Sequence, residues 1–115
     1  MARTRSGPPP APPHPGRILR DRVLPGLELS VSQAARELRI ARQTLHRILA
    51  GTLGVTPEMA TLLGHLSGTT PMFWLTLQQQ HDLWLAEKAL SGELNPIPAH
   101  SLPAIIKAEI GLHGD

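Results

Sequence analysis

Apolar residues in the first half of the chain recur with the period of short amphipathic helices. Val31, Ala35 and Leu38 follow one another at spacings of four and three, the repeat of one helix face. The pattern restarts after a brief interruption at Leu45, Ile48 and Leu49. We therefore predict two short helices joined by a tight turn, with Ser30 as the N-cap of the first and Gly51 as the stop of the second.

The outward positions of the second predicted helix share one property: each side chain can donate hydrogen bonds, and none is acidic. They are Arg42, Gln43, Thr44, His46 and Arg47. A helix that enters the major groove of DNA needs such donors for base edges and no carboxylates that repel phosphates. The other interpretation is an ordinary helical hairpin, but a solvated face usually mixes both charge signs. The sequence therefore favours a helix-turn-helix that binds DNA.

Three further helices are expected around this pair. The first covers residues 17–24 and is predicted to stop at Pro25-Gly26. Thr56-Pro57 and Thr70-Pro71 each combine an N-cap with a proline at the first helical position, so two more helices begin there. The last of them runs to about Lys88. The sequence thus predicts an all-α fold with five helices.

This last predicted helix carries more apolar surface than one small domain is expected to bury. Phe73, Leu77 and Trp84 share one of its faces. Core packing alone is one explanation. We favour core packing together with a symmetric interface between two copies, formed by these three residues. The expected assembly is a homodimer.

The segments outside residues 14–88, the predicted domain, differ in composition. Residues 1–13 are rich in proline, so a disordered tail is expected there, although Arg3 and Arg5 could touch DNA. The extension 89–115 holds four apolar residues at helical spacing: Leu102, Ile105, Ile106 and Ile110. A helix of about eight residues is too short to persist alone. We therefore expect it to be helical only when docked, most simply across the dimer.

Charge is unevenly distributed along the 115 residues, although the formal net charge is only +2. Nine arginines against three acidic residues give residues 1–50 a charge of +6, whereas residues 51–115 carry −4. The basic half contains the predicted DNA-reading helix, which supports a polyanionic partner there. The acidic half is free to meet a basic protein.

No motif indicates an enzyme, a metal site or a bound cofactor. The chain has no cysteine, and no two of its six histidines have the i, i+4 spacing of a helical metal pair. His14 has no partner in a motif and is expected to cap a helix or lie in a loop. No apolar run approaches the roughly 18 residues of a membrane span. We therefore expect a cytoplasmic protein with no membrane partner.

Motifs spread over residues 14–88 carry a family resemblance. They are His14-Pro15-Gly16-x-Ile18-Leu19, the helix from Ser30 to Leu38, Thr56-Pro57-Glu58-Met59-Ala60, and Pro71-Met72-Phe73-Trp74-Leu75-x-Leu77-Gln78. In this combination the chain resembles HigA/VapI-type antitoxins, which are Xre-like, lambda-repressor-like helix-turn-helix proteins. The resemblance implies a dimer that binds double-stranded operator DNA overlapping its own promoter. It also implies neutralisation of a HigB-type toxin, a small ribonuclease that cleaves messenger RNA.

The resemblance also assigns roles to residues of the two central helices. It implies that Arg42, Gln43 and Arg47 occupy the base-reading positions. Gln33, Thr44 and His46 are then expected to contact phosphates or the groove edge. Two positions depart from the family pattern. Arg39 replaces the usual turn glycine, so a strained left-handed backbone is expected there, and Ala50 replaces an asparagine that could contact phosphate.

Two other functions remain open from the sequence. One is a stand-alone Xre-type repressor without a toxin, and the other is a protein-interaction module whose DNA binding has decayed. A toxin-sized, basic reading frame immediately upstream of the gene would support the antitoxin. Weak salt dependence of DNA binding would favour the interaction module.

Overall fold

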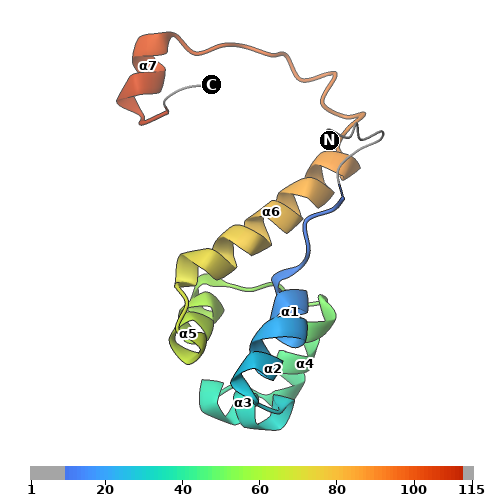
Figure 1. The fold of residues 1–115 in the computed structure, drawn as a ribbon. Helices are drawn as coiled ribbons and strands as arrows, with labels where there is room; N and C mark the ends of the chain where they lie inside the picture. The colour runs from blue at the N-terminus through green and yellow to red at the C-terminus, as the bar shows by residue number, and fades with distance from the viewer. Residues whose placement is uncertain (1–9, 113–115) are drawn as a thin grey trace, which may run out of the picture.

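The structure, a computed structural model, describes residues 10–112, which contain helices and no strands (Figure 1). The helices are α1 (Pro15–Ile18), η1 (Leu19–Val23), α2 (Leu24–Leu27), α3 (Val31–Leu38), α4 (Arg42–Ala50), α5 (Pro57–Ser67), α6 (Pro71–Ala89) and α7 (Ala104–Glu109). Because α1, η1 and α2 follow one another without a break, they form one helical stretch. The predicted all-α fold is therefore confirmed.

This first helical stretch continues through Pro25-Gly26, so the predicted stop there is wrong. Its middle part, η1, is a π-helical turn in which the Leu24 N–H donates to the carbonyl of Leu19, five residues earlier. A proline ring clashes with the carbonyl four residues earlier in a regular α-helix, and the wider turn directly before Pro25 changes that geometry. The stretch ends at Glu28, which has left-handed backbone angles (φ 56°).

Side-chain caps begin α3, α5 and α6, as predicted. The hydroxyl oxygens of Ser30, Thr56 and Thr70 each accept the backbone N–H three residues later, at 3.1–3.2 Å. The side chain of Gln33 does not complete the capping box, because its Nε2 donates to Glu37 Oε2 at 3.0 Å. Each such cap stabilises its helix by about 1 kcal/mol.

One apolar core joins the helices of residues 15–89. Its buried members are Leu19, Leu24, Ala34, Ala35, Leu38, Leu45, Ile48, Leu49, Val55, Ala60, Leu63 and Trp74. Trp74 is fully buried, and its Nε1 donates to Thr69 Oγ1 at 2.8 Å. Ala34 and Ala35 are small where α3 packs against α4, which lets these two short helices cross closely.

The turn between α3 and α4 has the left-handed backbone that the sequence analysis expected. Arg39 has φ 61° and ψ 43°. An L-residue other than glycine bears a cost of about 1–2 kcal/mol in this conformation. The turn is closed by the Arg39 N–H to the carbonyl of Arg36 and by the Ile40 N–H to the carbonyl of Ala35. These bonds set the angle at which α4 leaves α3.

Part of the proline-rich segment lies against α6. His81 Nδ1 donates to the carbonyl oxygen of Pro12 at 2.9 Å, and Pro12 is half-buried. The disorder expected over residues 1–13 stays a prediction. Residues 1–9, with Arg3 and Arg5, lie outside the described residues.

The C-terminal extension contains the expected helix, α7, at the end of a long extended connection (Figure 1). Ile105 and Ile110 are about two-thirds exposed, so the helix forms here without burying its apolar side chains. The docking expected for this segment stays a prediction. No helix within residues 10–112 combines the length and apolar character that crossing a bilayer requires.

Candidate nucleic-acid interface

The exposed side of α4 carries the side chains that the sequence analysis selected for DNA. Arg42, Gln43, His46 and Arg47 are exposed, and Thr44 is half-buried. The opposite side of α4 is held in the core by Leu45, Ile48 and Leu49. The surface that α4 presents to solvent is therefore basic and contains no carboxylate.

Ion pairs do not neutralise this surface in the described part of the chain. The two ion pairs of residues 10–112 both use Asp21, with Arg20 Nε at 2.7 Å and Arg17 Nε at 3.9 Å. Hydrogen bonds from Arg20 hold the pKa of Asp21 below its usual value. On α3, Gln33 is exposed but already donates to Glu37, so it must exchange this bond to reach a phosphate.

The N-terminus of α1 supports the C-terminal end of α4 at very short range. A Cβ atom placed on Gly16 would lie 1.7 Å from the carbonyl oxygen of Ile48. The same carbonyl accepts the N–H of Gly51, the left-handed residue that ends α4. Only glycine fits at position 16, because the backbones of α1 and α4 touch there.

His14 is the cap of α1, which confirms the structural role expected for it. Its Nδ1 accepts the N–H of Gly16 at 2.9 Å. Its ring packs edge-on against the ring of His81, with centroids 5.2 Å apart, and lies beside Gly51. His14 thus connects α1, the end of α4 and α6.

A buried glutamine, Gln78, fixes the loop after α4, a role that the sequence did not indicate although the residue belongs to one of the family motifs. Gln78 Oε1 accepts the N–H of Val55 at 2.7 Å, and its Nε2 donates to Asp82 Oδ1 at 2.9 Å. Gln78 is 7% exposed. The available signal was its position, four residues after Trp74 on the inward side of α6, where an apolar residue is expected.

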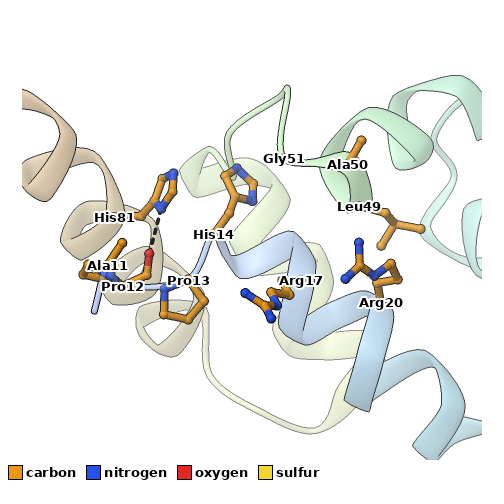
Figure 2. A pocket seen from close by; sticks show the side chains of 10 residues that line it. All are labelled: Ala11, Pro12, Pro13, His14, Arg17, Arg20, Leu49, Ala50, Gly51 and His81. Carbon is orange, nitrogen blue, oxygen red and sulfur yellow. Dashed lines mark hydrogen bonds between the residues drawn. The ribbon is translucent and has the colours of Figure 1, made fainter. Parts of the chain in front are cut away.

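A cavity of about 300 Å³ lies between the segment before α1, α1 itself, the end of α4 and α6 (Figure 2). Its lining includes two histidines, His14 and His81, and two arginines, Arg17 and Arg20. Within residues 10–112, no group of three or more histidine, aspartate or glutamate side chains is placed to hold a metal ion. The cavity therefore offers hydrogen-bond donors and positive charge to a bound group.

The stability of the domain is expected to fall as His14 becomes protonated. Burial lowers the pKa of His14 from 6.5, and His81 lowers it further, whereas Asp82 and a backbone hydrogen bond oppose this shift. The unfolded chain then binds the proton more readily than the folded chain. The contribution of His14 to the stability of the domain is therefore fully present above pH 6.5. It is lost as the pH falls through the lower pKa that His14 has in the folded chain.

This expectation is measurable as melting temperature against pH. Protonated Nδ1 cannot accept the Gly16 N–H, so the melting temperature of the wild-type protein should fall between neutral pH and about pH 5. His14→Asn keeps a cap acceptor without titrating, and should show a smaller fall. The exposed His46→Asn is the control and should follow the wild type. Equal slopes for the wild type and His14→Asn would contradict the assignment.

The three residues expected at a dimer interface lie on α6 in different surroundings. Leu77 is half-buried and packs against the core, so it already serves the monomer. Phe73 is 42% exposed, and Trp84 is half-buried beneath Lys88, whose Nζ lies 4.7 Å from the ring centroid. The second half of α6 projects beyond the other helices (Figure 1), and Leu85 on it is 48% exposed. Apolar surface remains uncovered along α6.

Comparison with known sequences finds relatives among regulators. No family model matches the chain. An uncharacterised helix-turn-helix transcriptional regulator of Escherichia coli, YddM, is 40% identical over 78 residues, which are 68% of this chain and 82% of that protein. Virulence-associated protein I of Dichelobacter nodosus is 32% identical over 75 residues, which are 65% of this chain and 69% of that protein.

Comparison with solved structures finds similar folds bound to DNA. Antitoxin HigA of Pseudomonas aeruginosa with the higBA promoter has a TM-score of 0.73 and 32% identity, covering 79% of this chain and 99% of the antitoxin. Antitoxin GraA in complex with its operator has a TM-score of 0.74 and 33% identity, covering 86% of this chain and all of GraA. The match therefore includes sequence as well as fold, and spans these antitoxins almost completely.

Proposed function

The chain belongs to the HigA/VapI-type family of helix-turn-helix proteins, and from this premise we propose that it represses its own operon and neutralises a HigB-type toxin. Its family consists of DNA-binding regulators and antitoxins rather than enzymes. The observation that carries the DNA-binding part is the exposed side of α4, which holds basic and uncharged donors and no carboxylate and belongs to a helix that packs against α1 and α3. A repressor of this kind works in the cytoplasm, where its operator is.

The exposed side chains of α4 suit the edges of bases in the major groove. Arg42 and Arg47 can each donate two parallel hydrogen bonds to guanine, and Gln43 can pair in the same way with adenine. Thr44, His46 and Gln33 are the proposed phosphate or groove-edge contacts. The N-cap of α4 is Ala41, which offers no side-chain acceptor, so the first backbone N–H groups of α4 are available to a phosphate.

A two-fold dimer would place two copies of α4 in successive turns of the major groove, about 34 Å apart. Uncovered apolar side chains on α6, including Phe73 and Leu85, support this assembly. Trp84→Glu is expected to split the dimer in sedimentation velocity at micromolar concentration. Gln79→Glu adds the same charge to an exposed position of α6 and should leave the dimer intact. A wild-type protein that sediments as a monomer would contradict the proposal.

The second part of the proposal is toxin neutralisation, and the acidic second half of the chain supports it. A ribonuclease needs a basic surface to hold RNA, and exposed acids such as Glu87 and Glu93 offer the complementary charge. The basic side of α4 is a poor contact for such a toxin. We therefore expect the toxin and the operator to use different surfaces of the chain.

Co-purification with the product of the neighbouring gene tests this expectation. The wild-type chain should retain the neighbouring toxin on an affinity column and protect cells that express it. Glu87→Lys with Glu93→Lys should weaken both effects by at least about tenfold, while promoter binding changes less. If the wild-type chain neither retains the neighbouring protein nor protects cells, the stand-alone repressor is the correct function.

A further inference from the structure

We propose that the cavity between α1 and the end of α4 binds a phosphate group of the operator backbone, with Arg17 and Arg20 as its donors. This inference rests on the proposed binding of DNA by α4. It assigns a contact outside the helix-turn-helix, on the first helical stretch, for which the sequence predicted no contact with DNA.

The position of the cavity relative to α4 carries the first part of the argument. Ala50 lines the cavity and follows Gln43 and Arg47 at spacings of seven and three, so the three residues share one exposed side of α4. Figure 2 shows the Leu49 side chain directed toward Arg20, whereas the Ala50 side chain points away from the two arginines. The cavity therefore opens directly beside the base-facing side, at its C-terminal end.

The length of α4 brings this end to the edge of the groove. Nine residues at about 1.5 Å each give a helix of roughly 13 Å, close to the width of the major groove, about 12 Å. When residues at the start of α4 contact bases, its last turn reaches the sugar-phosphate backbone. Ala50 has no donor there, so a phosphate at this point must be bound by neighbouring side chains.

The two donors, Arg17 on α1 and Arg20 on η1, suit a phosphate. The Arg17 side chain is 69% exposed, and its ion pair with Asp21 is long, with Nε 3.9 Å from Oδ2, so it contains no hydrogen bond that a phosphate would have to replace. Arg20 uses Nε and Nη2 for Asp21, at 2.7 and 3.2 Å, which orients the group and leaves Nη1 available. The three side chains together carry one positive charge. Guanidinium–phosphate bonds are among the stronger hydrogen bonds of proteins.

Each of the two histidines that line the cavity uses its Nδ1 for a hydrogen bond within the fold. His14 Nδ1 accepts the Gly16 N–H, and His81 Nδ1 donates to Pro12. Because the pKa of His14 is lowered, this ring is neutral at pH 7. Arg17 and Arg20 are therefore the proposed donors to the phosphate, and the two histidine rings line the cavity beside them.

The salt dependence of DNA binding tests this contact. The protein is titrated into the DNA upstream of its gene, and into unrelated DNA, from about 50 to about 200 mM salt. Arg17→Ala should weaken binding about tenfold on both DNAs and lower the slope of log K against log salt by about 0.9 per contact, or nearly 2 for a dimer. Arg17→Lys should keep most of the slope. For each variant, the ratio of the affinity for the upstream DNA to the affinity for unrelated DNA should equal that of the wild-type protein.

Arg22→Ala is the matched control, because it removes the same charge from the same helical stretch but does not line the cavity. It should leave the slope near the wild-type value. Equal losses for Arg17→Ala and Arg22→Ala would overturn the inference, since only overall charge would then matter. Saturable binding of inorganic phosphate by the free protein at micromolar concentration would also overturn it and indicate a free-anion site. If the wild-type protein does not prefer the upstream DNA, the proposed function fails instead.

Discussion

Replacing Gly16 by alanine is expected to destabilise the domain by about 3 kcal/mol or more. The new Cβ would meet the Ile48 carbonyl oxygen at 1.7 Å, and neither partner is a flexible side chain that can turn away. Moving the Ile48 carbonyl also breaks its bond to the Gly51 N–H, so the end of α4 is lost with the contact. At roughly 4–8 °C for each kcal/mol, the melting temperature should fall by 12 °C or more, about the largest shift expected here.

Thermal and urea denaturation measure this effect, and the chain offers a matched control. Gly26 also lies in the first helical stretch, but a Cβ placed on it meets no atom within 4 Å. Gly26→Ala should therefore be neutral or stabilise by up to about 1 kcal/mol. Similar melting temperatures for the two variants would show that the backbones of α1 and α4 do not approach each other as closely as described.

Removing both arginines from the exposed side of α4 is expected to abolish repression. Each bidentate contact to a base contributes about 1–3 kcal/mol of discrimination, so Arg42→Ala with Arg47→Ala should cost about 2–6 kcal/mol in each half-site. Toxin protection should remain, because the proposed toxin surface lies in the acidic half of the chain. The double variant therefore separates the two proposed activities.

A promoter–reporter assay and a footprint measure this loss directly. Lys88→Ala with Lys107→Ala is the control, since it removes the same two charges from α6 and α7. It should keep the footprint and the repression. A footprint of unchanged position and affinity for the arginine variant would show that α4 does not read the operator.

Local patterns predicted most of the fold because short-range physics determines it. The Ser30, Thr56 and Thr70 caps depend on residues within one turn, and a sequence displays them directly. The left-handed Arg39 was expected only from the family resemblance, which places a turn glycine at this position. The π-helical turn before Pro25 was not foreseen. Proline-glycine usually ends a helix, and nothing in the periodicity indicates a wider turn.

Long-range contacts were the part that the sequence could not supply. The bond from Val55 to Gln78 joins residues 23 apart, and the bond from His81 to Pro12 joins residues 69 apart. The cavity with Arg17 and Arg20 is lined by residues of the segment before α1, α1, η1, the end of α4 and α6, which only the folded chain brings together. The donor side of α4 was visible from its spacing alone, since a helix places those positions on one side by itself.

The most direct test of the central claim is the affinity of the wild-type protein for the DNA upstream of its own gene, measured against a scrambled duplex of equal composition at physiological salt. Specific binding by α4 predicts a preference of at least about 1,000-fold. It also predicts protection of two half-sites with centres about 10 base pairs apart. Equal affinity for the two duplexes, with no protected half-sites, would contradict the account.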